Sequence, residues 1–268
     1  MNKSLLLTFL LSQFTFIIII IIILHFSSFN LLEAYGINET QRNYSIDFDK
    51  LVDEYLNWWV NLPFEEDPQQ LDNPCVIQKT DSIIFLQDPF EMGNIKNICT
   101  IPHKSLFFPF YVGWCDNGSQ GIYGTNSYKE LLECTLDANR GIVAMDAYLD
   151  DKKIVDLLID NTNVHNLKVL SNNSLDNYYQ QIGPTDIFTL IVTNKTQYTY
   201  YEKPQDFASS PAKYKAIAYC FCGFIDKDKI SPGTHQLSYH TKIEGSGGLD
   251  KTKGWDHEST ITYSLTVE

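Results

Sequence analysis

The stretch Ser259-Thr260-Ile261-Thr262-Tyr263-Ser264-Leu265-Thr266-Val267, or STITYSLTV, alternates apolar and polar residues near the C-terminus. Successive side chains of a β-strand point to opposite faces, so this pattern predicts one buried face and one wet face. Strand character recurs along the chain, in the ranges 76–86, 106–112, 142–149, 187–193, 214–224 and 235–243. The sequence therefore predicts an all-β fold, a two-sheet antiparallel sandwich of jelly-roll or Greek-key type.

Turn and cap signals divide these strands and add two helices. Asp150-Asp151 is expected to close a hairpin, and Ser231-Pro232-Gly233 to turn into the strand at 235–243. Apolar residues at helical spacing within 45–59 predict an N-terminal helix, with Ser45 as its N-cap and Pro63 stopping it. Ser127 opens a capping box with Glu130, which predicts an inserted helix ending near 140–141.

An apolar run from Leu5 to Phe29 dominates the N-terminus. Its length suits either a long signal peptide or an uncleaved membrane anchor within residues 1–36. Ala34 and Gly36 provide the small residues that signal peptidase recognises, and Lys3 favours a cytoplasmic N-terminus. Both alternatives export residues 37–268 as a single β-sandwich domain, either secreted or held at the extracellular face of the cytoplasmic membrane.

The formal net charge of the chain is -13 at pH 7. Proteins that bind nucleic acid or anionic lipid need a basic stripe to neutralise phosphates, and the sequence has none. We therefore expect no nucleic-acid partner, and membrane contact only through an uncleaved N-terminal segment. An acidic surface is otherwise typical of a soluble extracellular protein.

Several motifs together resemble a set of exported prokaryotic hypothetical proteins. They are Trp58-Trp59, Cys75, Ile83-Ile84-Phe85-Leu86, Cys99-Thr100-Ile101-Pro102, Leu106-Phe107-Phe108-Pro109, Ser231-Pro232-Gly233-Thr234-His235 and Thr262-Tyr263-Ser264-Leu265-Thr266-Val267. The resemblance covers roughly residues 50–268 and implies a shared exported β fold, without implying any activity. This chain departs from the pattern at Cys220 and Cys222, where the set usually carries aromatic and aliphatic residues.

Six cysteines in an exported chain are expected to be mainly oxidised. Sequence proximity and the resemblance favour two disulfides, Cys75 with Cys99 and Cys115 with Cys134. The second of these would attach the inserted helix to the strand that precedes it.

The remaining pair lies two residues apart in Ala218-Tyr219-Cys220-Phe221-Cys222-Gly223-Phe224. Three interpretations stay open. A regular strand separates such Cα atoms by about 6.5 to 7 Å, so a disulfide between Cys220 and Cys222 would be strained and readily reduced. The two thiolates could instead bind zinc or copper with His235 or His240 from a neighbouring strand. Two buried thiols are the third interpretation.

Local catalytic motifs are missing from the sequence: it has no G-x-S-x-G, H-E-x-x-H, phosphate-binding glycine loop or dinucleotide fingerprint. The stretch Asp256-His257-Glu258-Ser259 contains the residue types of a hydrolase triad. Adjacent residues on a strand point to opposite faces, however, so these four cannot form a relay among themselves. The sequence therefore identifies no reaction, and it leaves the cofactor and any catalytic residues unknown.

Aromatic residues suggest a binding role instead, with four Trp, sixteen Tyr and sixteen Phe. Trp58 and Trp59 are adjacent on a helix, so they diverge by about 100 degrees, and Trp58 is expected to be partly exposed. Trp58 and the cluster Tyr198, Tyr200 and Tyr201 are candidate ligand platforms, since aromatic faces pack against sugar rings. Sequons predict glycosylation at Asn38, Asn43, Asn117, Asn172 and Asn194.

These patterns favour a non-enzymatic exported protein that binds an extracellular glycan or a surface protein. The alternative is a metal-binding protein or metal-dependent enzyme that uses Cys220 and Cys222 with a nearby histidine.

Overall fold

The computed structural model describes residues 46–63, 75–87, 93–118, 127–139, 141–160, 168–175, 178–193, 196, 211–244 and 257–268. All of them belong to one compact unit, Tyr44–Glu268. The expected signal segment, residues 1–36, lies outside the described residues.

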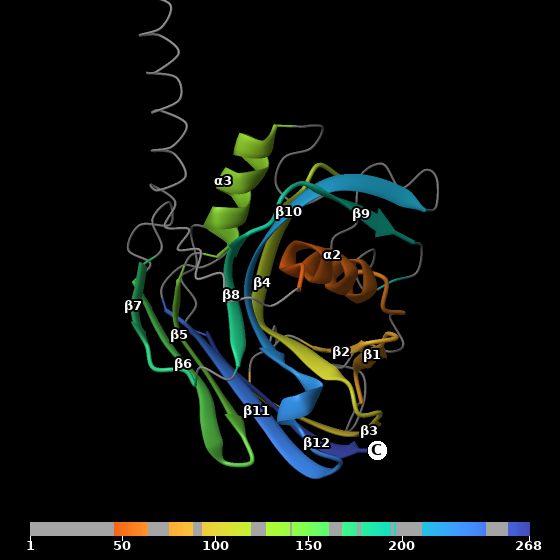
Figure 1. Ribbon diagram of the computed structural model, residues 1–268. Helices are drawn as coiled ribbons and strands as arrows, with labels where there is room; N and C mark the ends of the chain where they lie inside the picture. Colours follow the sequence, from red (N-terminus) through yellow and green to blue (C-terminus); the bar gives the residue numbers. More distant parts are fainter. Residues whose placement is uncertain are drawn as a thin grey trace, which may run out of the picture. The chain divides into compact units, whose positions relative to one another are not determined.

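Strands dominate this unit, and they form two sheets that make a sandwich (Figure 1). In chain order the elements are α2 (Phe48–Trp59), β1 (Ile77–Lys79), β2 (Ile83–Leu86), β3 (Gly93–Ile101), β4 (Ser105–Asp116), α3 (Tyr128–Ala138), β5 (Ile142–Leu149), β6 (Lys152–Asp160), β7 (Lys168–Asn172), β8 (Tyr179–Pro184), β9 (Phe188–Val192), β10 (Ala212–Ile225), the 3-10 helix η4 (Lys227–Lys229), β11 (Gly233–Ile243) and β12 (His257–Val267). The first sheet has the order β1-β2-β4-β10-β8, with β9 also paired to β10. The second sheet has the order β3-β12-β11-β5-β6-β7. The predicted sandwich with an N-terminal and an inserted helix is confirmed.

Two pairings make the sheets mixed rather than purely antiparallel. β2 runs parallel to β4, and β3 runs parallel to β12, whereas the other described pairs are antiparallel. The chain leaves the first sheet after β2, forms β3 in the second sheet and returns as β4. This excursion replaces the tight turn that an antiparallel neighbour would need, so β4 enters beside β2 in the same direction.

The strand quoted above is β12, and it lies inside the second sheet between β3 and β11. Its predicted inner face is confirmed, because Ile261, Tyr263 and Leu265 are fully buried. The range 76–86 was predicted as a single strand, and this was wrong. A turn at Asp81 and Ser82 divides it into the antiparallel pair β1 and β2.

The predicted hairpin at Asp150 and Asp151 is confirmed between β5 and β6, and both residues have positive φ, 51° and 62°. Asp tolerates this left-handed conformation better than most residues. The sequence did not predict β3, β6, β7 or β8, whose patterns are less regular.

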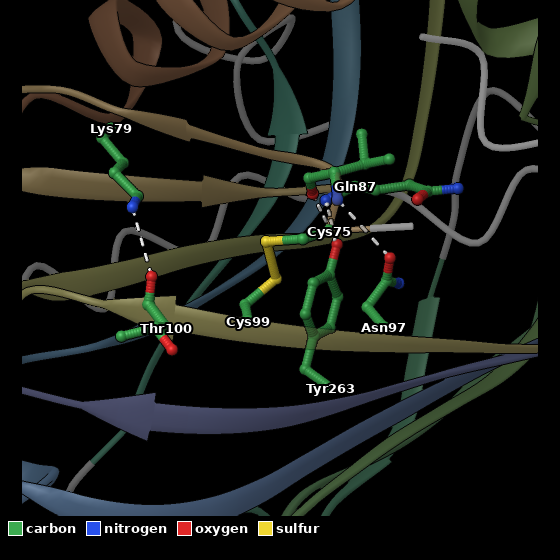
Figure 2. Close-up of a disulfide and its surroundings, with 8 residues drawn as sticks. Cys75, Lys79, Gln87, Asn97, Cys99, Thr100 and Tyr263 are labelled. Atoms are coloured by element: carbon green, nitrogen blue, oxygen red, sulfur yellow. Dashed lines mark hydrogen bonds between the residues drawn. A yellow bond between two sulfur atoms is a disulfide. The ribbon is translucent and has the colours of Figure 1, made fainter. Parts of the chain in front are cut away.

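The two sheets are joined by a disulfide and a group of hydrogen bonds (Figure 2). The bridge links Cys75, just before β1, to Cys99 in β3. The Tyr263 hydroxyl donates to the Val76 carbonyl at 2.9 Å and accepts from the Gln87 amide at 3.1 Å. These contacts attach one end of the first sheet to the edge strand β3 of the second sheet and to its neighbour β12.

Both helices pack on the β4–β10 pair, but on opposite faces (Figure 1). The even-numbered residues of β10, including Ala218, Cys220 and Cys222, join the buried cluster formed with α2. The opposite face of the pair receives α3, which is bonded to β4 through the disulfide Cys115–Cys134. The predicted role of this disulfide is therefore confirmed.

The helix starts show how local chemistry sets the boundaries. Asp47, rather than the predicted Ser45, caps α2, because its side chain accepts from the Lys50 amide at 3.1 Å. Ser127 caps α3 as predicted, accepting from the Glu130 amide at 3.4 Å. Each accepted bond satisfies one of the amides that a helix start leaves unpaired.

Candidate functional site

A groove of about 670 Å³ lies between the C-terminal half of α2 and the β1–β2 hairpin. We call it the α2 groove. Its residues are Glu54, Asn57 and Trp58 from the helix, Asn61, Leu62 and Pro63 from the following turn, and Gln78, Thr80 and Phe85 from the hairpin. An aromatic surface combined with a few polar groups in a concave site is typical of small-molecule binding.

Trp58 forms the aromatic wall of this groove. Its ring is stacked on Phe85, with centroids 6.5 Å apart, and meets Tyr55 and Trp59 edge-on at 5.6 and 5.9 Å. Trp59 is 8% exposed and belongs to the core, whereas Trp58 is only partly buried. The predicted divergence of the two tryptophans is therefore confirmed, and Trp58 is the one that reaches the groove.

Asn57 of α2 and Asn61 of the turn after it pair with the edge of β9, a contact that the sequence did not predict. Asn57 donates to the Thr189 carbonyl at 3.1 Å and accepts from the Ile191 amide at 2.8 Å. Asn61 donates to the Ile191 carbonyl at 2.6 Å and accepts from the Thr193 amide at 2.8 Å. A carboxamide has the donor and acceptor of a peptide group, so these two side chains act as an added strand.

These bonds position the helical wall of the groove and protect a sheet edge from other pairings. They also occupy the donor and the acceptor of both amides, so neither asparagine is the main polar contact for a ligand. The sequence pattern that could have predicted this contact is the pair of asparagines at i and i+4. In a helix this spacing places two side chains on the same face.

Polar groups of the hairpin wall differ in how they are engaged. Gln78 Oε1 is buried and has no hydrogen-bond partner within the described part of the chain. The Thr80 hydroxyl donates to the Ile83 carbonyl at 2.8 Å, and the Thr80 carbonyl accepts from Lys104. This oxygen of Gln78 has almost no solvent-accessible surface, so a ligand would satisfy it only after the Gln78 side chain turns toward the groove.

Acidic side chains follow the exposed face of α2. Glu54 lines the groove and lies 3.6 Å from Lys50, with both side chains largely exposed. Burial raises the pKa of Asp53, against the lowering effect of its hydrogen bond from Asn57. Burial likewise raises the pKa of Asp49. This side of the helix therefore has an acidic character.

The predicted metal ligands are not brought together, which corrects that interpretation. Cys220 and Cys222 form a disulfide, and both are buried on the face of β10 that packs against α2. His235 and His240 belong to β11 in the other sheet and are bonded to carboxylates there. In the described ranges no group of three or more His, Cys, Asp or Glu residues is placed to hold a metal ion.

The strain expected for Cys220–Cys222 does not follow from its Cα separation. The two Cα atoms are 5.6 Å apart, inside the usual disulfide range of about 4.4 to 6.8 Å. The pairing of β10 with β4 shifts register between Phe221 and Cys222, opposite Tyr111 and Pro109. The extra residue of this β-bulge, Phe110, lies in β4, and the bulge distorts the ladder beside Cys220 and Cys222, so the spacing of a regular strand need not hold there.

His235 lies in an arrangement that resembles a catalytic triad without having its chemistry. Its Nδ1 is 2.7 Å from Asp150 Oδ2, and its Nε2 is 3.5 Å from Ser231 Oγ. The Ser231 carbonyl is closer to Nε2, at 2.8 Å, and a carbonyl can only accept, so Nε2 donates to it and is not free to take a proton from the Ser231 hydroxyl. Pro232 follows Ser231 and offers no amide for an oxyanion hole.

This histidine instead joins the turn before β11 to the β5–β6 hairpin. Burial would raise the pKa of Asp150, but hydrogen bonds from the Gln236 amide and His235 lower it below its usual value. Asp150 therefore remains a carboxylate acceptor that fixes the corner of the sheet.

His240 lies between two carboxylates on the outer face of the second sheet. Its Nδ1 is 3.2 Å from Asp146 Oδ2, and its Nε2 is 2.9 Å from Glu258 Oε1. The hydrogen bond with Asp146 raises the pKa of His240, against the lowering effect of burial, and Glu258 raises it further. This cluster is electrostatic support between strands β5, β11 and β12.

Other predicted site residues are only partly described. Tyr198, Tyr200 and Tyr201 lie outside the described residues, as do the sequon positions Asn38, Asn43 and Asn194. Asn172 is exposed on β7, and its side-chain oxygen accepts from the Ser174 amide at 3.1 Å. Asn117 is half-buried and its side-chain oxygen accepts from the Lys215 amide at 2.8 Å.

Comparison with known proteins adds no family to this geometry: no family model, no curated protein and no solved structure matches the chain. The resemblance to exported prokaryotic proteins therefore remains a prediction. Within the ranges that the structure covers, no helix is long and apolar enough to cross a membrane.

Proposed function

We propose that this protein is an exported, non-enzymatic binding protein that holds an extracellular glycan in the α2 groove. The observation that carries the proposal is the position of Trp58, partly buried on Phe85 and lining a groove with polar groups on both walls. Sugar rings pack their C–H faces on such a surface while their hydroxyls bond to polar groups at its margin.

Three disulfides support the exported location, because such bonds persist in oxidising compartments. The apolar run at 5–29 supports it as well, whether it is a cleaved signal or an anchor. The protein then acts in solution outside the cell or at the extracellular face of the cytoplasmic membrane.

A glycan array tests this proposal with three proteins: the native chain, Trp58→Ala and Tyr128→Ala. Tyr128 is a matched control, since it is an exposed aromatic residue on the other helix, α3, away from the groove. Stacking of one ring on an aromatic side chain contributes about 1 kcal/mol, so Trp58→Ala should weaken binding at least about fivefold and Tyr128→Ala should not.

Two results would reject the proposal. One is an array without signal for the native protein, and the other is binding that Trp58→Ala leaves unchanged. If the protein captures a surface protein and shows no glycan signal, the ligand of the groove would be a protein and not a glycan.

A further inference from the structure

Two acceptor groups of the α2 groove restrict which glycan it can hold. Glu54 contributes a carboxylate from the helical wall, and Gln78 contributes a buried oxygen with no partner among the described residues. A buried acceptor favours a ligand that brings a hydroxyl or N–H donor, because leaving it unpaired costs about 1 to 3 kcal/mol.

The direction of α2 adds to this acceptor character. Trp58 and Asn61 lie at the C-terminal end of the helix, where backbone carbonyls give a partial negative charge. The last turn of α2 contains no basic residue to offset that charge. An anionic group placed against this end is therefore disfavoured.

The cations near the groove are already engaged. Lys50 lies 3.6 Å from Glu54, and the Lys104 ammonium donates to the Thr80 carbonyl. Neither lysine lines the groove. The chain as a whole has a formal net charge of -13, so its long-range field repels polyanions as well.

We infer that the α2 groove selects uncharged or amino sugars and discriminates against uronic, sialylated and sulfated glycans. The inference rests on the proposed function and specifies its ligand class. Trp58 provides the stacking surface, Gln78 accepts a hydroxyl or amide hydrogen from the sugar, and Glu54 accepts a second donor or pairs with an amino group.

The first test sorts by charge those array glycans whose signal depends on Trp58. We expect neutral and amino sugars among them, and expect acidic glycans to be absent. Signals on acidic glycans that Trp58→Ala abolishes would overturn the inference and leave the proposed function standing. An array with no Trp58-dependent signal would overturn both.

The second test changes the charge of the groove with a matched control. Glu54→Gln and Glu133→Gln each remove an exposed carboxylate that pairs with a lysine four residues earlier, on α2 and on α3 respectively. Calorimetry with a β-1,4-linked glucosamine tetramer should show about two- to fivefold weaker binding for Glu54→Gln, and no change for Glu133→Gln. Equal effects of the two variants would contradict a role for Glu54 in selection.

The third test addresses the buried acceptor. Gln78→Leu keeps a side chain of similar size but removes the oxygen, so the strongest neutral glycan on the array should bind about tenfold more weakly. Gln78→Asn keeps the acceptor chemistry and should lose less. Unchanged affinity in Gln78→Leu, with an unchanged unfolding midpoint, would show that the ligand does not reach this oxygen.

Discussion

The two helices pack on opposite faces of the same strands, yet they are held there in different ways. α3 is bonded covalently to β4 through Cys115–Cys134, and Thr135 donates to the Ile217 carbonyl of β10 at 3.0 Å. None of the three disulfides includes a residue of α2. Aromatic packing around Tyr55 and the amides of Asn57 and Asn61 hold that helix instead.

This difference separates scaffold from site. A disulfide that constrains the unfolded chain stabilises α3 without any need for an exposed surface. The packing of α2 leaves one side of the helix facing the β1–β2 hairpin, and residues of both line the groove. We therefore expect changes at α3 to affect stability alone, and changes on the exposed side of α2 to affect binding.

The largest expected effect comes from the disulfide of α3. Cys115→Ala with Cys134→Ala opens a loop with a sequence separation of 19, so the free energy of unfolding should fall by about 3 kcal/mol. The matched change under α2, Cys220→Ala with Cys222→Ala, opens a separation of 2 and should cost only about 1.5 kcal/mol by the same reasoning.

Urea unfolding measures both costs, and glycan binding should survive in each folded variant. If the loss in free energy of unfolding is smaller without Cys115–Cys134 than without Cys220–Cys222, the proposed difference between the two helices would be wrong.

The second effect concerns the strand-like amides of α2. Asn61, in the turn after α2, gives the β9 edge a donor and an acceptor, so Asn61→Ala should lower the free energy of unfolding by about 1 to 2 kcal/mol. Amide hydrogen exchange gives a sharper readout, because Asn61 accepts from Thr193 and Asn57 accepts from Ile191.

The Thr193 amide should therefore exchange faster in Asn61→Ala, and the Ile191 amide faster in Asn57→Ala. Equal protection in both variants and the native chain would show that these amides do not fix α2 on β9.

The smallest effect serves as a reference that affects neither helix. Carboxylates raise the pKa of His240 in the folded protein. The contribution of His240 to the free energy of unfolding is therefore complete below the pKa of an unfolded histidine, about 6.5. That contribution is lost as the pH rises through the higher pKa of the folded state. Exposed partners reduce this contribution to less than about 1 kcal/mol.

His240→Gln should flatten the stability profile above about pH 6.5 and leave glycan binding unchanged. If His240 instead made the native chain more stable as the pH rises, the assignment of a raised pKa to His240 would be contradicted.

Local patterns predicted the parts of the fold whose residues are neighbours in sequence. The alternation in β12, the cap at Ser127 and the turn at Asp150 each follow from a few adjacent residues. The parallel pairing of β3 with β12 joins segments from distant parts of the chain, so no local signal could reveal it. Helix geometry likewise predicted the exposure of Trp58.

The other groove residues depend on distant contacts. Asn57 bonds to Ile191, which lies 134 residues away, and Gln78 faces α2 only because of how β1 is placed. The state of Cys220 and Cys222 stayed open in the sequence because it depends on a bulge in the ladder with β4.

The central claim is that the α2 groove, centred on Trp58, holds the ligand. The most direct test is a nitrogen-15 NMR titration of the folded domain with the strongest neutral glycan from the array. The indole N–H signal of Trp58 should shift markedly, while that of Trp114, whose indole nitrogen is buried, should stay in place. An unmoved Trp58 signal, with shifts gathered around Tyr148 and His240 on the second sheet, would contradict the account.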